Sequence, residues 1–331
     1  MVCLVPPMQP QESVPLSVVT TLYRSAPFID EFYRRMSAAA SASCADYEIV
    51  IVNDGSPDNS LQLALRLAEQ DERIRVVDFS RNFGHHAAIM AGLRHARGRL
   101  VFLIDIDLEE RPEWLVDFWE DLHREGVDMV YGVQERRVGG VWKRATGGLF
   151  YKLFNAVSDT SIPESACTVR LMTRDYVNAV TQTQEVNLFL AGIFAWFGFS
   201  QRARTVRKEA RQGTTYTLRR LLSLFIHAIT SFSSYPLYLV FLAGTVITGL
   251  ATLYGVYLIV DKLLHPDAIM SGFTSLMASL WFLGGLIISF LGLIGIYLGK
   301  LFAEVKGRPQ YVVRRVYEKG AALETGASGN A

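Results

Sequence analysis

Short apolar runs alternate with amphipathic stretches along the first hundred residues. The runs are rich in β-branched residues and predict buried strands, and the stretches between them have helical spacing. The predicted strands cover residues 16–23, 47–56, 74–80 and 99–105, and the predicted helices cover residues 26–41, 58–71 and 85–96. This alternation predicts an α/β fold with a mostly parallel sheet and helices on both faces. Ligands of such sheets bind beyond the carboxyl ends of the strands, where we expect Asp54 and Asp105 to converge.

The pattern changes near residue 236. Residues 236–260 are a run of 25 residues without a charge, and residues 275–299 form a second uncharged run. A helix over the first run would extend roughly 37 Å, which is enough to cross a hydrocarbon core of about 30 Å. Two buried core helices are the alternative. We expect a hairpin of two transmembrane helices, at about 236–260 and 275–300.

Basic residues flank this hairpin on one side. Arg219 and Arg220 precede it and Lys300 and Lys306 follow it, whereas Lys262 is the one fixed positive charge between the two runs. The positive-inside rule then places the N-terminal part and the C-terminus in the cytoplasm. Residues 217–235 are expected to form juxtamembrane interfacial helices, with an amphipathic helix packed on the domain as the alternative.

Composition adds three constraints. The chain has 331 residues and a formal net charge of +1, so no global field attracts nucleic acid. Its mean hydropathy is +0.21, and the apolar excess is concentrated near the C-terminus. Its three cysteines fit no disulfide or zinc spacing, which is typical of a reducing compartment. The first fourteen residues are expected to be a tail without a signal peptide.

The candidate chemistry lies at the ends of the predicted strands. The stretch "VFLIDIDLEE" puts Asp105 and Asp107 after a buried strand, where two carboxylates would repel each other. "VNDGSPDNS" and "RNFGHHAAIMAG" follow the two preceding strands. Together, "IVNDGSPDNS", "SRNFGHHAAIMAGLRHARG" and "DIDLEERPEWL" resemble the family 2 glycosyltransferases with a GT-A fold. "GIYLGKLFAEVKGRPQYVV" (295–313) resembles the C-terminal part of membrane-bound polyprenyl-phosphate glycosyltransferases, and the resemblance covers nearly the whole chain.

The resemblance implies a nucleotide-sugar donor and a divalent cation, Mg²⁺ or Mn²⁺. Such cations use one or two carboxylates together with phosphates, and they offset the repulsion between the carboxylates. By resemblance Asp107 binds the metal, and Asp105 contacts the nucleoside and helps to orient the metal. The implied nucleotide-binding residues are Tyr23, Asp54, Gly55, Ser56, Arg81, Asn82, Gly84 and Asp105. An ordinary βα loop is the alternative for the Arg81–Gly84 turn.

The sequence departs from the family pattern in two places. Family members usually have Pro-x-Tyr-Asn-Glu after the first strand, where this chain has Thr21, Arg24 and Ser25 in place of the proline, asparagine and glutamate. Relatives also carry an aspartate before an Arg-Leu or Arg-Ala pair, often assigned as catalytic base. Glu164 is nearest to that position here, with a solvated loop carboxylate as the alternative.

A cluster of basic residues precedes the apolar runs. In the stretch "RARTVRKEARQGTTYTLRR" (202–220), the residues expected to bind an acceptor phosphate are Arg207, Lys208, Arg211, Thr214 and Thr215. The alternative is a basic belt on anionic lipid, worth about 1 kcal/mol per residue.

Together with the apolar runs, the resemblance implies a glycosyltransferase of the bacterial inner membrane, and inversion is implied by the family alone. It would move one sugar from a UDP-, GDP- or dTDP-linked donor to undecaprenyl or another polyprenyl phosphate, for modification of a cell-envelope glycan or glycolipid such as lipopolysaccharide. The Gly-rich apolar runs permit a homo-oligomer. The alternatives are a non-catalytic nucleotide-binding scaffold or lipid carrier, and a processive polysaccharide synthase. The expected domains are a tail (1–14), a cytoplasmic GT-A domain (15–216), the interfacial helices (217–235), two transmembrane helices (236–303) and a cytoplasmic tail (304–331), disordered from residue 318.

Overall fold

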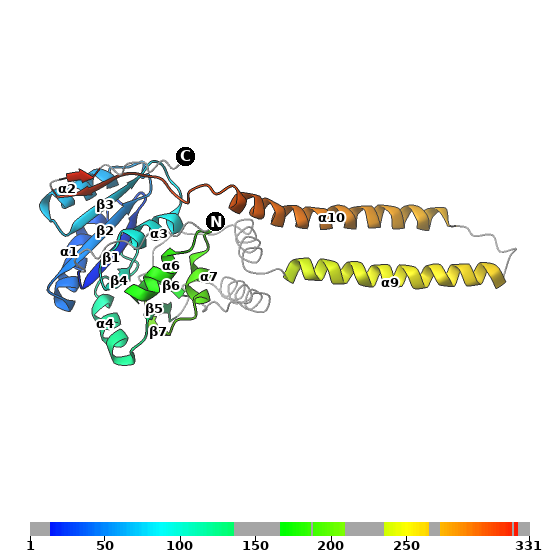
Figure 1. Ribbon diagram of the computed structural model, residues 1–331, viewed down its shortest axis with the longest axis horizontal. Helices are drawn as coiled ribbons and strands as arrows, with labels where there is room; N and C mark the ends of the chain where they lie inside the picture. Colours follow the sequence, from blue (N-terminus) through cyan, green and yellow to red (C-terminus); the bar gives the residue numbers. More distant parts are fainter. Residues whose placement is uncertain are drawn as a thin grey trace, which may run out of the picture. The chain divides into compact units, whose positions relative to one another are not determined.

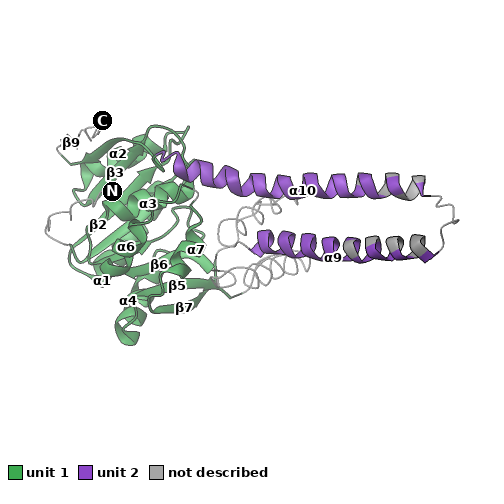
Figure 2. Cartoon of the chain, turned by 45° about the vertical axis from the view of Figure 1, so that its right-hand side comes forward, with its two compact units in different colours: residues 1–151, 161–216, 309–331 green, residues 152–160, 217–308 purple. Residues whose placement is uncertain are grey.

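The chain divides into two compact units, which Figure 2 colours separately. The computed structural model describes residues 14–135, 166–186, 188–208, 235–264, 272–319 and 321–323. Unit 1 comprises Met1–Tyr151, Ser161–Tyr216 and Pro309–Ala331, and unit 2 comprises Lys152–Thr160 and Thr217–Arg308. The expected interfacial helices over 217–234 lie outside the described residues.

The described part of unit 1 contains a nine-stranded sheet in the order β7-β5-β6-β4-β1-β2-β3-β8-β9. Its strands are β1 (Leu16–Leu22), β2 (Tyr47–Asn53), β3 (Ile74–Phe79), β4 (Leu100–Leu103), β5 (Met129–Gln134), β6 (Ala166–Thr173), β7 (Gln201–Val206), β8 (Val313–Glu318) and β9 (Ala321–Leu323). The pairing pattern makes β6 and β8 run opposite to the other strands. The expected mostly parallel α/β fold is therefore confirmed.

Helices cover both faces of this sheet (Figure 1). They are α1 (Ile29–Ser43), α2 (Ser60–Gln70), α3 (His85–His95), α4 (Trp114–Glu125), α6 (Arg174–Thr181) and α7 (Leu190–Trp196). Helices α1, α2 and α4 share one apolar core with the inward side chains of β1 and β2. Helix α3 packs on the opposite face so closely that a Cβ on Gly92 would lie 2.4 Å from Val19 and 3.2 Å from Val52.

The four central strands end at the same edge of the sheet. Strands β1, β2 and β3 are paired in parallel, with Leu22 opposite Asn53 and Asn53 opposite Asp78. Strand β4 pairs in parallel with the other side of β1. These strands are buried on both faces, which explains their continuous apolar runs. The loops that follow them therefore meet at one edge.

The C-terminal residues correct one expectation. Residues 304–331 were expected to form a tail that is disordered from residue 318, but β8 pairs antiparallel with the edge of β3, with Asp78 opposite Arg315, and β9 pairs with β8. The Glu318 carboxylate accepts a hydrogen bond from Arg97 at 2.8 Å and pairs with the buried Arg75. These strands cover an edge of the sheet that would otherwise expose unpaired backbone groups.

Unit 2 contains two long helices, α9 (Tyr235–Leu264) and α10 (Phe273–Val305), which lie side by side in both views (Figures 1 and 2). Among the residues described, one segment, Phe282–Val305, is long and apolar enough to cross a membrane, with a hydropathy of 2.1. A shorter apolar segment, Tyr235–Ala251, lies in α9. A two-helix membrane hairpin is therefore not established by length and composition.

Candidate functional site

Asp54 binds the loop that follows β3. Its side chain lies at the end of β2, and the residue is 3% exposed. Its Oδ1 accepts a hydrogen bond from the backbone N–H of Phe83 at 2.6 Å, and its Oδ2 accepts one from Gly84 at 3.0 Å. Burial raises the pKa of Asp54, and these two hydrogen bonds oppose that rise. The carboxylate therefore fixes the Arg81–Gly84 turn at the edge of the sheet.

Gly55 allows the same two loops to touch. Its φ is +58°, and a Cβ at this position would lie 2.5 Å from the carbonyl carbon of Arg81 and from the backbone nitrogen of Asn82. Only glycine accommodates both the left-handed backbone and this close approach. The turn after β2 therefore contacts the backbone of the Arg81–Gly84 turn directly.

Ser56 connects the loop after β1 to the loop after β2. Its hydroxyl donates to Asp58 Oδ1 at 2.6 Å and accepts from the backbone N–H of Arg24 at 2.7 Å. The Arg24 guanidinium lies 5.6 Å from the ring centroid of Tyr23, which is 47% exposed. The exposed Tyr23 ring therefore lies beside Arg24, in the loop after β1 that Ser56 contacts.

Asp105 and Asp107 lie in a turn after β4. The strand ends at Leu103, so the two carboxylates do not share a strand face. Asp107 Oδ1 accepts a hydrogen bond from the backbone N–H of Glu109 at 3.1 Å, and Leu108 between them has a φ of 63°. A left-handed backbone costs a non-glycine residue roughly 1–2 kcal/mol, and such strain concentrates at functional sites.

His85 joins the Asp54 loop to the Asp105 turn. It is the first residue of α3, and its Nε2 lies 3.5 Å from Asp105 Oδ1. Its Nδ1 lies 3.2 Å from the hydroxyl oxygen of Thr21. Partial burial lowers the pKa of His85, while the charges of Asp54, Glu110 and Asp107 oppose that effect. The imidazole therefore lies where the acidic residues of the loops after β2 and β4 approach one another, beside Thr21 of β1.

Glu110 forms a buried ion pair behind the Asp105–Asp107 turn. The residue is 0% exposed, and its Oε1 lies 2.9 Å from Lys208 Nζ and accepts from the backbone N–H of Thr168 at 3.0 Å. Burial and the charge of Asp105 raise the pKa of Glu110, and Lys208 opposes them. Burial lowers the pKa of Lys208, but Glu110 outweighs burial and the pKa is raised. Glu110 thus connects the turn after β4, the start of β6 and the chain that follows β7.

The carboxylates at this edge fit a hard divalent cation. Burial raises the pKa of Asp105 to about 6, against a hydrogen bond from the Thr168 side chain and the charge of Lys208. No group of three or more His, Cys, Asp or Glu side chains that could hold a metal occurs in the described ranges. One or two carboxylates suffice where the phosphates of a ligand complete the coordination. Asp105 and Asp107 meet that requirement.

Comparison with known proteins identifies the family. The model described as "Glycosyl transferase family 2" matches residues 17–181. A Mycobacterium tuberculosis protein named among "Putative glycosyltransferases" is 45% identical over 94% of this chain and 90% of its own length. The chain belongs to glycosyl transferase family 2.

Two further proteins resemble this glycosyltransferase over most of its length. The Escherichia coli "Prophage bactoprenol glucosyl transferase homolog" is 35% identical over 91% of this chain and 99% of its own length. The solved mannosyltransferase PcManGT from Pyrobaculum calidifontis, in complex with GDP-Man and Mn²⁺, is 16% identical with a TM-score of 0.43, over 90% of this chain and 88% of that chain.

In this glycosyltransferase, most of the predicted site residues lie at one edge of the sheet. Asp54, Gly55 and the Arg81–Gly84 turn are in direct contact, and Lys208 reaches the Asp105 turn through Glu110. Arg207 is exposed. The remaining predictions lie outside the described residues and concern Glu164, Arg211, Thr214 and Thr215.

Sequence reasoning missed two residues of the glycosyltransferase site. His85 was not assigned to the site from the sequence, although its position directly after the predicted Gly84 turn is a signal that it starts a helix there. Glu110 carries no comparable signal, because the sequence does not distinguish it from the neighbouring Glu109. Only the fold shows that Glu110 is the one with a fully buried side chain.

Proposed function

We propose that this chain transfers one sugar from a nucleotide-sugar donor to a polyprenyl phosphate. The observation that carries the proposal is the match to the bactoprenol glucosyl transferase homologue, which spans 99% of that protein. The match therefore includes the part that follows the catalytic domain. The acidic edge of the sheet supports the same reaction, because a nucleotide sugar brings a diphosphate that binds a divalent cation.

The donor would bind across the loops after β1, β2, β3 and β4. We assign Tyr23, Asp54, Gly55, Ser56, Arg81, Asn82, Gly84 and Asp105 to the nucleotide. Asp54 already accepts two backbone hydrogen bonds, so its remaining lone pairs are the ones available to a base. Asp107, with Asp105 beside it, would hold Mg²⁺ or Mn²⁺, which would stabilise the departing diphosphate.

The proposed transfer is an in-line displacement with inversion. An oxygen of the lipid phosphate attacks the anomeric carbon, a new carbon–oxygen bond forms, and the bond to the nucleoside diphosphate breaks with its electron pair. A phosphate monoester has a second pKa of about 6, so the attacking oxygen is already ionised at neutral pH. A strong general base is therefore not required. Glu164 is assigned to that role only because it is the carboxylate nearest in sequence to the position where relatives carry an aspartate.

The acceptor phosphate would bind to the basic segment that follows β7. We assign Arg207, Lys208, Arg211, Thr214 and Thr215 to this role. The Lys208 ammonium group has three donors, and the contact with Glu110 at 2.9 Å accounts for one of them. Glu110 would thus orient Lys208 while its other donors face the acceptor.

We further propose that α9 and α10 form a membrane hairpin with both chain ends in the cytoplasm. Strand β8, which follows α10, pairs with β3, which precedes α9. Both strands must therefore be on the same side of any membrane, and the number of crossings between them must be even. Because α10 contains a segment of sufficient length and hydropathy, α9 would have to supply the second crossing. The bacterial inner membrane, where polyprenyl phosphates are used, is the expected location.

A donor screen tests this proposal. The full chain in detergent is mixed with Mn²⁺ or Mg²⁺, undecaprenyl phosphate and a panel of UDP-, GDP- and dTDP-linked sugars, and the lipid is analysed by mass spectrometry. We expect one donor to add one sugar, with loss of product on addition of EDTA. Polymeric products would indicate a processive synthase. Nucleotide binding without transfer from any donor would contradict the proposal and favour a non-catalytic role.

A further inference from the structure

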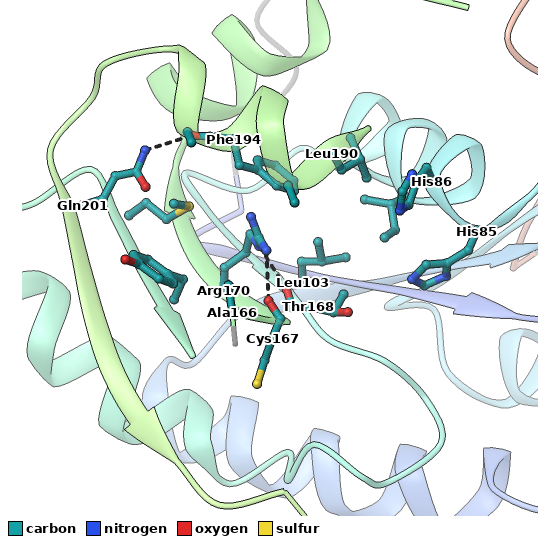
Figure 3. A pocket seen from close by; sticks show the side chains of 15 residues that line it. His85, His86, Leu103, Ala166, Cys167, Thr168, Arg170, Leu190, Phe194 and Gln201 are labelled. Carbon is teal, nitrogen blue, oxygen red and sulfur yellow. Dashed lines mark hydrogen bonds between the residues drawn. The ribbon is translucent and has the colours of Figure 1, made fainter. Parts of the chain in front are cut away.

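A cavity of about 150 Å³ lies beside the acidic edge in unit 1. Helices α3 and α7 and strands β4, β5, β6 and β7 contribute its lining (Figure 3). Leu103, Leu190 and Phe194 supply apolar surface, and Tyr131, Arg170 and Gln201 supply polar groups. An engineered protein cavity of about this volume holds one benzene molecule. The cavity therefore has room for a single six-membered ring.

Arg170 is held rigidly at this cavity. The residue is 6% exposed, and its guanidinium lies 3.7 Å from the ring centroid of Phe194. Its Nε donates to the carbonyl oxygen of Thr168 at 3.0 Å, and its Nη2 donates to the carbonyl oxygen of Cys167 at 3.0 Å. Figure 3 shows the guanidinium among the lining side chains, directed toward Phe194. Its orientation is therefore set before any ligand arrives.

The described residues do not use every donor of the guanidinium. Of its five N–H groups, two donate to the carbonyl oxygens of Thr168 and Cys167. No carboxylate of the described residues lies within ion-pair distance of Arg170, although buried cations are normally paired or fully hydrogen-bonded. A ligand that presents oxygen acceptors to this cavity would satisfy the remaining donors.

Two lining residues of the cavity, His85 and Thr168, also contact Asp105 of the proposed donor site. His85 lines the cavity, and His85 Nε2 lies 3.5 Å from Asp105 Oδ1. Thr168 also lines it, donates its backbone N–H to Glu110 and hydrogen-bonds Asp105 through its side chain. A group attached to a diphosphate at Asp105 and Asp107 would therefore be next to the cavity.

From this geometry we infer that the cavity is the subsite for the sugar ring that is transferred, and that Arg170 selects the sugar by donating hydrogen bonds to its hydroxyl oxygens. The inference rests on the proposed function. The cavity has room for one ring. The apolar side chains of Leu190 and Phe194 provide surface for the C–H face of a pyranose, and the guanidinium provides donors for its oxygen atoms. Arg170 is thus a specificity residue that the nucleotide does not touch.

The test compares two ligands in one variant. Binding of the donor found in the screen, and of its nucleoside diphosphate, is measured with Mn²⁺ on the full chain in detergent. Arg170→Ala should weaken binding of the nucleotide sugar by about tenfold or more, because charged hydrogen bonds are lost, and binding of the diphosphate by less than about twofold. Tyr131→Phe removes the hydroxyl of another lining residue and should weaken binding of the nucleotide sugar alone. It serves as the second variant if Arg170→Ala does not fold.

Arg174→Ala is the matched control. Arg174 follows β6, is also partly buried, and donates through Nε to the carbonyl oxygen of Gly98 at 2.8 Å, but it does not line the cavity. Arg174→Ala should change the affinities for the nucleotide sugar and for the nucleoside diphosphate equally or not at all. Equal losses for both ligands in Arg170→Ala, no loss in a folded protein, or a change confined to the KM of the lipid acceptor would each overturn the inference. Sugar transfer by the wild type tests the proposed function separately. A wild type that binds nucleoside diphosphates but no nucleotide sugar would overturn both the proposed function and the inference about the sugar subsite.

Discussion

Asp107 is the residue on which the metal assignment depends. Asp107→Asn keeps the shape of the side chain and an oxygen that can accept from Glu109, but it removes the negative charge. Loss of a metal ligand should lower kcat by at least about a hundredfold, since metal stabilisation of the leaving group is worth several kcal/mol. Thermal unfolding should change little. Asp30→Asn, in an exposed pair with Arg66, is the control and should keep normal activity. Near-normal turnover in Asp107→Asn would remove the assignment.

Gly55 tests the contact between the loops after β2 and β3. Gly55→Ala adds a left-handed strain of about 1–2 kcal/mol and a clash with the Arg81 backbone. Gly126 has a similar φ of +63° but has nothing within 4 Å of its would-be Cβ, so Gly126→Ala carries the strain without the clash. We expect Gly55→Ala to lower the unfolding temperature more than Gly126→Ala, and to weaken nucleotide binding where Gly126→Ala does not. Equal effects of the two variants would show that the close approach is unimportant.

Residues that follow predicted strands could be assigned to the site from sequence, whereas residues that support them could not. Asp54, Asp105 and Asp107 are polar groups at the ends of apolar runs, and that pattern is local. The partners of Glu110 are Thr168 and Lys208, which are 58 and 98 positions away. Arg170 is part of the Arg-Leu pair noted in the sequence, yet only the packing of α7 on β6 shows that it lines a cavity.

At the scale of elements, the Glu110–Lys208 pair connects the turn after β4 to the chain after β7. Glu110→Gln leaves the Lys208 ammonium without its partner and should destabilise the protein by about 3 kcal/mol. Lys208→Met in the same chain removes the unpaired charge and should restore part of that stability, which a double-mutant cycle from thermal unfolding would measure. Additive losses in the double variant would show that the two side chains are not coupled. The KM for the lipid acceptor should rise both in Lys208→Met alone and in the double variant.

Strands β1 to β4 and the helices between them were predictable, because each is a separate periodic segment bounded by turn residues. The pairing of β8 with β3 was not. Val313–Glu318 contains two arginines and follows the apolar helices directly, so its composition resembles a basic flank of a membrane segment. It becomes a strand because β3 offers an unpaired edge more than 200 residues earlier in the chain. Contacts with the rest of the fold, which local sequence patterns do not indicate, determine the secondary structure of such a segment.

For the molecule as a whole, the C-terminal strands are part of the catalytic domain. Glu318 is the contact to test, because it pairs with Arg75 and Arg97 from elements that precede both long helices. Glu318→Ala should lower the stability of the domain by about 2 kcal/mol, since the buried Arg75 loses a charged hydrogen bond and keeps the His95 carbonyl oxygen at 2.6 Å and the Glu48 carboxylate at 3.6 Å. Glu72→Ala, at an exposed position, is the control and should be neutral. An unchanged unfolding temperature in Glu318→Ala would indicate that β8 contributes nothing to stability.

The same pairing of β8 with β3 leads to a prediction about membrane topology. If α10 crosses a membrane, the shared sheet requires an even number of crossings, so residues 265–271 must be on the side opposite to both chain ends. Single cysteines at Ser271→Cys and Ser328→Cys, in a chain whose Cys3 and Cys44 are replaced by serine and whose buried Cys167 is replaced by alanine, would report the two sides. An impermeant maleimide should label Ser271→Cys in intact cells and Ser328→Cys only after lysis. Equal labelling of both positions would rule out the hairpin, because the paired strands hold the C-terminal segment on the side of the catalytic domain.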